Sequence, residues 1–123
     1  MRPKINERVV ACREFYQALL PGLRYVAYRY GYALCVHGSL RRDIDLVAVP
    51  WRVAAPPAES LIQALAKATE ALIGTARFRE QDRNPEEKPY GRKAWSIYLT
   101  PMDEAPYLDI SVMPTEWTEK KKK

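Results

Sequence analysis

The chain has 123 residues, of which 47% are hydrophobic and 28% are charged, which fits one domain with a packed core and excludes a disordered chain. The formal net charge is +5, but Lys120–Lys123 supply four of these charges, so the folded body is nearly neutral and the tail is expected to be a solvated terminus. No apolar run approaches the roughly 20 residues of a membrane-spanning helix, and we expect a cytoplasmic protein without membrane contact.

The chain contains two cysteines, Cys12 and Cys35, and its only histidine is His37. There is no CxxC spacing, and this set is too small for a zinc site. We therefore expect two buried free thiols, as is usual in a reducing compartment.

A helix is predicted from about Glu7, because apolar residues up to Leu20 recur at spacings of three and four. Pro21 interrupts this pattern, so the helix is expected to continue as a second helix or a kinked extension that ends at Gly31. The tyrosines of this segment are expected to pack against a sheet or to lie at its edge, and base stacking is the alternative. They are Tyr16, Tyr25, Tyr28, Tyr30 and Tyr32.

Two strands are predicted next, over 32–37 and 43–49, and the turn Gly38-Ser39-Leu40-Arg41-Arg42 joins them. A second helix follows the Ala- and Pro-rich linker at 54–57, and Gly74 ends it. The predicted apolar face of this helix consists of Leu61, Ile62, Leu65, Ala66, Thr69, Leu72 and Ile73.

The last third of the chain predicts a β-hairpin. A short strand is expected at 75–78 and a polar loop at 79–91, before two strands at 95–100 and 107–113 that pair antiparallel. In the last strand, Leu108, Ile110 and Val112 alternate with Tyr107, Asp109, Ser111 and Met113, so the apolar set is expected to face the core. Trp51 and Trp95 are expected to pack in the core or at the sheet edge, with base stacking again as the alternative.

Three aspartates form the candidate site. Asp43 and Asp45 should point to one face of their strand, because side chains alternate, and two such carboxylates repel each other unless a cation lies between them. Asp109 lies in mid-strand, where acidic residues are depleted. It would complete a cluster that holds divalent cations if the hairpin pairs beside the second strand. The alternative is that the three carboxylates are solvated or form ion pairs, for example with Arg41 and Arg42.

The chain resembles the nucleotidyltransferase superfamily of the DNA polymerase β type. The resemblance is carried by Gly38-Ser39, by Asp43-x-Asp45 after it, and by Asp109 on a later strand. The minimal single-domain members, and the short nucleotidyltransferase-like proteins of phages and prophages, are the most similar. The resemblance covers about residues 6–114 of one domain over 1–123 and leaves 115–123 as a basic tail. It implies an α+β fold with a mixed, twisted sheet and helices packed mainly on one face.

The resemblance also implies an activity, the transfer of a nucleoside monophosphate from a nucleoside triphosphate to an acceptor hydroxyl. In it, Asp43 and Asp45 would bind magnesium, Asp109 would help to deprotonate the acceptor, and Gly38-Ser39 would contact the triphosphate. Only three residues separate Ser39 from Asp43, fewer than in most members. Arg41 or Arg42 would therefore have to bind phosphate as well.

Other interpretations remain open. The chain could be a catalytically inactive accessory protein of the same fold, with an unidentified acceptor or partner protein, and a homodimer could bury the open side of the sheet. Nucleic-acid binding through the tail and the loop at 77–92 is disfavoured, because acidic residues interrupt that loop. Arg92 and Lys93 are expected to be exposed rather than at the rim of the site, and His37 to be partly buried rather than catalytic.

Overall fold

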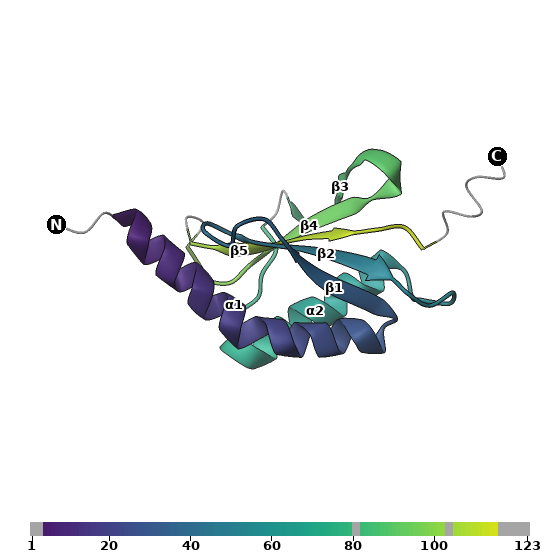
Figure 1. Cartoon of the computed structure of the whole chain (residues 1–123), viewed down its shortest axis with the longest axis horizontal. Helices are drawn as coiled ribbons and strands as arrows, with labels where there is room; N and C mark the ends of the chain where they lie inside the picture. The colour runs from purple at the N-terminus through teal and green to yellow at the C-terminus, as the bar shows by residue number, and fades with distance from the viewer. Residues whose placement is uncertain (1–3, 80–81, 103–104, 116–123) are drawn as a thin grey trace.

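The structure, a computed structural model, describes residues 4–79, 82–102 and 105–115. This part of the chain forms two α-helices and a five-stranded sheet (Figure 1). In chain order the elements are α1 (Lys4–Arg29), β1 (Tyr32–His37), β2 (Ile44–Pro50), α2 (Ala58–Ile73), β3 (Glu86–Glu87), the 3₁₀ turn η2 (Pro89–Gly91), β4 (Lys93–Tyr98) and β5 (Tyr107–Val112). The basic segment at 116–123, with Trp117 and the four lysines, lies outside the described residues.

The sheet is mixed, with the strand order β1-β2-β5-β4-β3. Neighbouring strands pair antiparallel except for β2 and β5, which pair in parallel. Parallel strands need a crossover connection, which here contains α2 and the first strand of the hairpin. This crossover places β5 beside β2 in the middle of the sheet, although the two strands are far apart in the chain.

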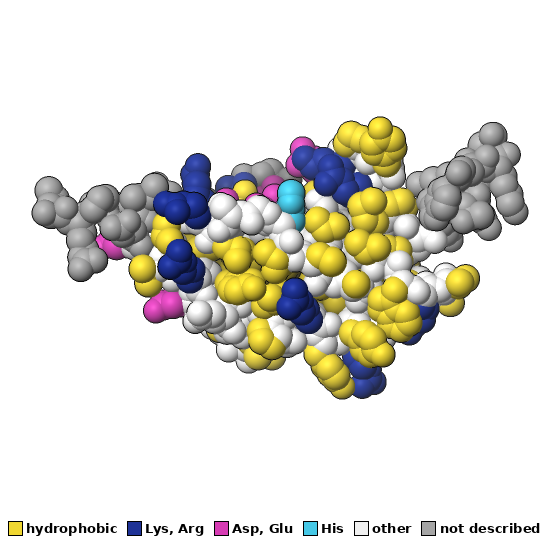
Figure 2. Space-filling model, in the orientation of Figure 1, with side chains coloured by type: hydrophobic (Ala, Val, Ile, Leu, Met, Phe, Trp, Pro, Cys, Tyr) yellow, Lys and Arg dark blue, Asp and Glu magenta, His cyan; other side chains and the backbone are white. Residues whose placement is uncertain are grey.

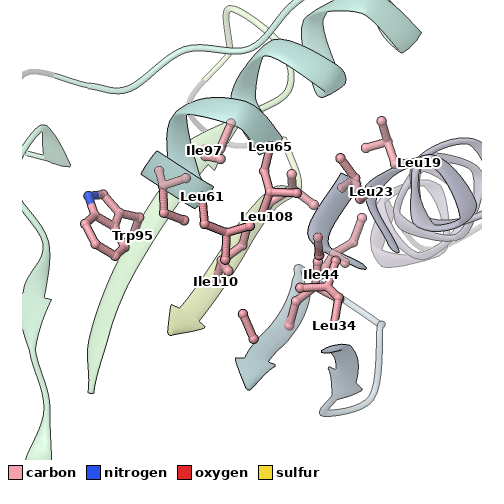
Figure 3. Close-up of a cluster of buried hydrophobic side chains, with 14 of the residues drawn as sticks. Leu19, Leu23, Leu34, Ile44, Leu61, Leu65, Trp95, Ile97, Leu108 and Ile110 are labelled. Atoms are coloured by element: carbon pink, nitrogen blue, oxygen red, sulfur yellow. The ribbon is translucent and has the colours of Figure 1, made fainter. Parts of the chain in front are cut away.

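Both helices cover the same face of the sheet (Figure 1). α1 contacts β1 and α2, and α2 contacts β4. Figure 3 shows the core between these layers, with Leu19 and Leu23 of α1 and Leu61 and Leu65 of α2 over the sheet. The apolar residues of β5 face the helices and are buried, whereas the residues between them are only half-buried. These observations confirm the predicted α+β fold and the predicted hairpin.

Pro21 does not divide the first helix. α1 is continuous with Pro21 inside it, and the helix axis changes direction along its length (Figure 1). A proline removes one helical hydrogen bond. Leu20 and Leu23, on either side of it, are buried in the core, and this burial stabilises both halves of the helix. α1 is also too charged, and α2 too short, for either helix to cross a bilayer, and no described helix meets that requirement.

Several local predictions were wrong. Cys35 is exposed, because β1 alternates and places it on the open face, whereas Cys12 is buried as predicted. Leu72 is 49% exposed near the end of α2. The segment at 75–78 contributes only an isolated bridge between Arg77 and Tyr98, not a strand. The predicted loop contains β3 and η2, and β2 begins one residue later than predicted. The other strand ends differ from prediction by at most two residues.

Candidate functional site

A row of polar side chains crosses the open face of the sheet, the face opposite the helices. In the strand register, His37 of β1 lies opposite Asp45 of β2, Asp45 lies beside Asp109 of β5, and Asp109 lies opposite Ser96 of β4. Residues that are partners in register point to the same face. The structure therefore brings Asp45 and Asp109 together as direct neighbours on parallel strands.

Burial and neighbouring negative charge raise the pKa of both carboxylates. Burial, and next the charge of Asp43, raise the pKa of Asp45, while His37 lowers it. Burial, and next the charge of Asp45, raise the pKa of Asp109, while Lys88 lowers it. A raised carboxyl pKa means that the folded protein disfavours the ionised form. The open face therefore holds negative charge that a cation would stabilise.

Asp43 lies outside strand β2, in the bend just before it, and has a partner of its own. Its Oδ1 accepts a hydrogen bond of 2.8 Å from Nη2 of Arg8, and Arg8 Nε donates to the carbonyl oxygen of Arg42 at 3.2 Å. Arg8 thus fixes the turn before β2 to the first helix. The alternative of an ion-paired carboxylate thus applies to Asp43, but its partner is Arg8, whereas Arg41 and Arg42 are exposed on the turn.

Gly38 is required for the close approach of the turn to Asp45. Its φ is +85°, a conformation that favours glycine, and a Cβ at this position would lie 2.8 Å from Asp45 Oδ2. Leu40 also has a positive φ of 60°. Ser39 is exposed at the tip of this turn. The turn between β1 and β2 therefore passes directly over one carboxylate of the pair.

Two cations from the loop before β4 face the carboxylates. A cavity of about 230 Å³ is lined by His37, Asp45, Leu46, Lys88, Arg92, Asp109 and Ser111. Lys88 Nζ also ion-pairs with Glu86 at 3.2 Å. Arg92 is half-buried, so the expectation of an exposed residue away from the site was wrong. No sequence pattern identifies Lys88 as a residue of the site, because the fold of the loop decides where this side chain points.

A second, larger cavity of about 460 Å³ adjoins the other side of Asp109. It is lined by Asp82, Asn84, Pro85, Glu86, Ala94, Trp95, Ser96, Tyr107 and Asp109. Burial, and next the charges of Asp43 and Asp109, raise the pKa of Tyr107. Asp109 is thus the residue that the two cavities share.

The exposure of His37 and of one tryptophan differs from what the sequence predicts. His37 is exposed on the open face rather than partly buried. Trp95 is 5% exposed and belongs to the core, as expected, whereas Trp51 is 50% exposed. Figure 2 shows the histidine in cyan near the upper edge of the view, close to acidic side chains in magenta.

The donors suit a hard divalent cation, although they do not form a complete cage. Within 4–79, 82–102 and 105–115, no three His, Cys, Asp or Glu side chains converge closely enough to hold a metal ion. Magnesium, however, is often held by one or two carboxylates together with substrate phosphates. Asp45 and Asp109 offer those two carboxylates, and Asp43 would have to leave Arg8 to add a third. The predicted roles of the three aspartates stay predictions.

Comparison with known proteins found no family model, no curated protein and no solved structure that matches the chain.

Proposed function

We propose that the open face of the sheet binds a nucleoside triphosphate with a divalent cation and transfers the nucleotide to an acceptor hydroxyl. The observation that carries this proposal is the pairing of Asp45 with Asp109 on parallel strands. Each of the two has a raised pKa, and Lys88 and Arg92 line the same cavity. Carboxylates beside cations in one cleft suit a metal bound next to phosphates.

Each residue of the site would have a distinct role. Asp45 and Asp109, with Asp43 if it leaves Arg8, would hold Mg²⁺ or Mn²⁺. The bound ions would polarise the α-phosphate and stabilise the leaving pyrophosphate. Lys88 and Arg92 would neutralise phosphate oxygens by charge-assisted hydrogen bonds. Exposed Arg41 and Arg42, on the turn with Gly38 and Ser39, would contact the triphosphate from the other side.

Asp109 is the candidate general base. It adjoins the larger cavity, which offers room for an acceptor. Asp109 would accept the proton of an acceptor hydroxyl that enters from that side.

Calorimetric titration with MgATP and the other magnesium triphosphates tests the binding step. We expect the wild-type chain to bind at least one of them and Asp45→Asn to lose that binding. Asp82→Asn is the matched control, because Asp82 lines only the larger cavity and already ion-pairs with Arg79 at 2.7 Å. Absence of binding by the wild-type chain, or equal binding by Asp45→Asn, would contradict the proposal.

The ion pair of Arg8 with Asp43 at 2.8 Å favours a second candidate, an inactive accessory protein of the same fold. In that case Asp43 stays on Arg8 and no cation is needed. Release of pyrophosphate from bound triphosphate, with water or an added hydroxyl compound accepting the nucleotidyl group, separates the two candidates. We expect release from the wild-type chain and none from Asp109→Asn. A partner complex that survives Asp45→Asn, without pyrophosphate release, would favour the accessory protein.

A further inference from the structure

An aromatic groove lies at the other end of β1 from the carboxylate row. It is an open cavity of about 650 Å³ lined by Pro21, Arg24, Tyr25, Tyr28, Tyr32, Ala33, Leu34 and Trp51. Three of its rings are largely exposed: Tyr25 at 60%, Tyr28 at 62% and Trp51 at 50%. A contiguous group of exposed aromatic side chains of this kind marks a binding surface.

The rings of the aromatic groove are held in place by the fold. Tyr28 of α1 stacks on Trp51, which follows β2, with centroids 5.2 Å apart and planes 25° apart. The Trp51 backbone N–H donates to the carbonyl of Gly31 at 2.9 Å. Arg29 Nη1 donates to the Tyr25 hydroxyl at 3.0 Å, and its guanidinium lies 5.8 Å from the centre of that ring. A platform that is already ordered loses little conformational entropy on binding.

Positive charge surrounds the aromatic groove. Residues 15–42 and 46–58 contain no aspartate or glutamate, and they supply Arg24, Arg29 and Arg52. Among the described residues, no carboxylate ion-pairs with any of these three arginines. In Figure 2, hydrophobic and basic side chains cover the described right-hand part of this face, with no acidic side chain among them. The ligand should therefore carry negative charge.

The negative charge of Glu59 affects one residue of the aromatic groove, Tyr32. Burial, and next the charge of Glu59, raise the pKa of the Tyr32 hydroxyl. The Glu59 carboxylate, however, ion-pairs with Lys93 at 3.2 Å. Tyr32 itself is buried, and its hydroxyl donates to the carbonyl of Pro56 at 2.7 Å. Glu59 therefore does not neutralise the exposed arginines.

We propose that the aromatic groove binds single-stranded nucleic acid, with bases stacked on Tyr28, Trp51 and Tyr25 and phosphates on the arginines. Aromatic rings beside cations are the usual combination for unpaired strands, because every base has a flat face that stacks. An added peptide strand is disfavoured at this edge, because Arg24 Nε already donates to the Leu34 carbonyl of edge strand β1 at 3.2 Å. The site is distinct from the carboxylate row, and binding there does not require nucleotidyl transfer.

Fluorescence anisotropy with labelled oligo-dT and oligo-U of about 20 nucleotides tests this proposal on the full chain. We expect binding at low salt that weakens as salt rises, and weaker binding to a duplex of equal length. Tyr28→Ala and Trp51→Ala should each weaken binding roughly tenfold, and Tyr28→Phe should retain it. Excess MgATP should not displace the oligonucleotide, and Asp45→Asn should bind it normally, which separates this site from the candidate active site.

Two control variants sharpen the test. Tyr90→Asn removes a ring that is 93% exposed elsewhere, at a φ of 66° that asparagine tolerates, and it should bind like the wild type. Replacement of Lys120–Lys123 by glutamine should reduce affinity only modestly. The proposal is overturned if this tail variant abolishes binding while the Tyr28→Ala/Trp51→Ala double variant binds normally. It is also overturned if an acidic peptide binds the groove and the oligonucleotides do not. Circular dichroism of each variant verifies that it is folded.

Discussion

Asp109→Asn tests whether the carboxylate pair is held together against its own repulsion. The substitution keeps the shape of the side chain and removes its charge. Adjacent strands lie about 4.8 Å apart, and at about 5 Å two charges repel by about 3 kcal/mol at a dielectric constant of 20 and by about 1 kcal/mol at 80. Because the pair is only half-buried, we expect the free energy of unfolding to rise by about 1–2 kcal/mol. This gain corresponds to about 4–8 °C in Tm.

The gain should depend on pH. Burial and Asp45 raise the pKa of Asp109 above its ordinary value of 3.8. A group whose pKa is raised by folding stabilises the protein fully below its unfolded pKa, and this contribution is lost as pH rises through the folded pKa. The difference between variant and wild type should therefore be absent at about pH 3 and present at pH 7. Thermal and urea unfolding followed by circular dichroism at both pH values measure it.

Asp43→Asn is the comparison variant, because it removes the same charge from a carboxylate that Arg8 already stabilises. It also relieves the repulsion that Asp43 exerts on Asp45, and the lost ion pair opposes this gain, so its net effect at pH 7 should be smaller than the gain of Asp109→Asn. The reasoning would be refuted if Asp109→Asn lowered stability at pH 7, or if its gain were the same at both pH values.

Three further predictions concern the structure around the site. Gly38→Ala should cost more than Gly74→Ala in urea unfolding, because both glycines have positive φ but only Gly38 has a neighbour, Asp45 Oδ2, where the new Cβ would lie. We expect about 1 kcal/mol for Gly74→Ala and about 2 kcal/mol or more for Gly38→Ala, and equal losses would show that the close approach is not rigid. Arg8→Gln should lower stability by about 1 kcal/mol or less. The loss should be smaller in an Asp43→Asn background, where the hydrogen bond from Arg8 to the Arg42 carbonyl remains, and an undiminished loss would argue against a stabilising ion pair. Leu65→Ala, in a fully buried position, should cost about 2–5 kcal/mol in the same assay, and a loss below 1 kcal/mol would contradict the assigned core.

Local patterns were sufficient to predict the helical segments and the strands β1, β2, β4 and β5. The alternation in β5 identified which residues face the core, because the period of a strand is fixed by its backbone. Gly74 was predicted to end α2, and it does so with a φ of +88° and an N–H that donates to the Glu70 carbonyl at 2.8 Å. The effect of Pro21 could not be decided from sequence. The helical hydrogen bond that it removes is a local loss, whereas the burial of the leucines beside it depends on contacts with the rest of the core.

The candidate site was only partly accessible to sequence reasoning. The types of residue at Asp45 and Asp109 suggested a shared role, but their contact depends on a parallel register that joins distant strands. A slip of one residue in that register would send one of the two carboxylates into the core. Arg8 and Lys88 were not predicted, because their partners and positions arise from contacts across helix, turn and loop.

The sequence by itself determined the helical segments, the four longer strands, the apolar face of the last strand and the acidic residues that stand out from it, because these follow from short-range periodicity and chemistry. Only the tertiary structure decided which charges meet and which aromatic rings stay exposed. The reason is physical: side-chain neighbours on different elements are chosen by strand register and helix packing, which depend on burial over the whole core rather than on any single segment.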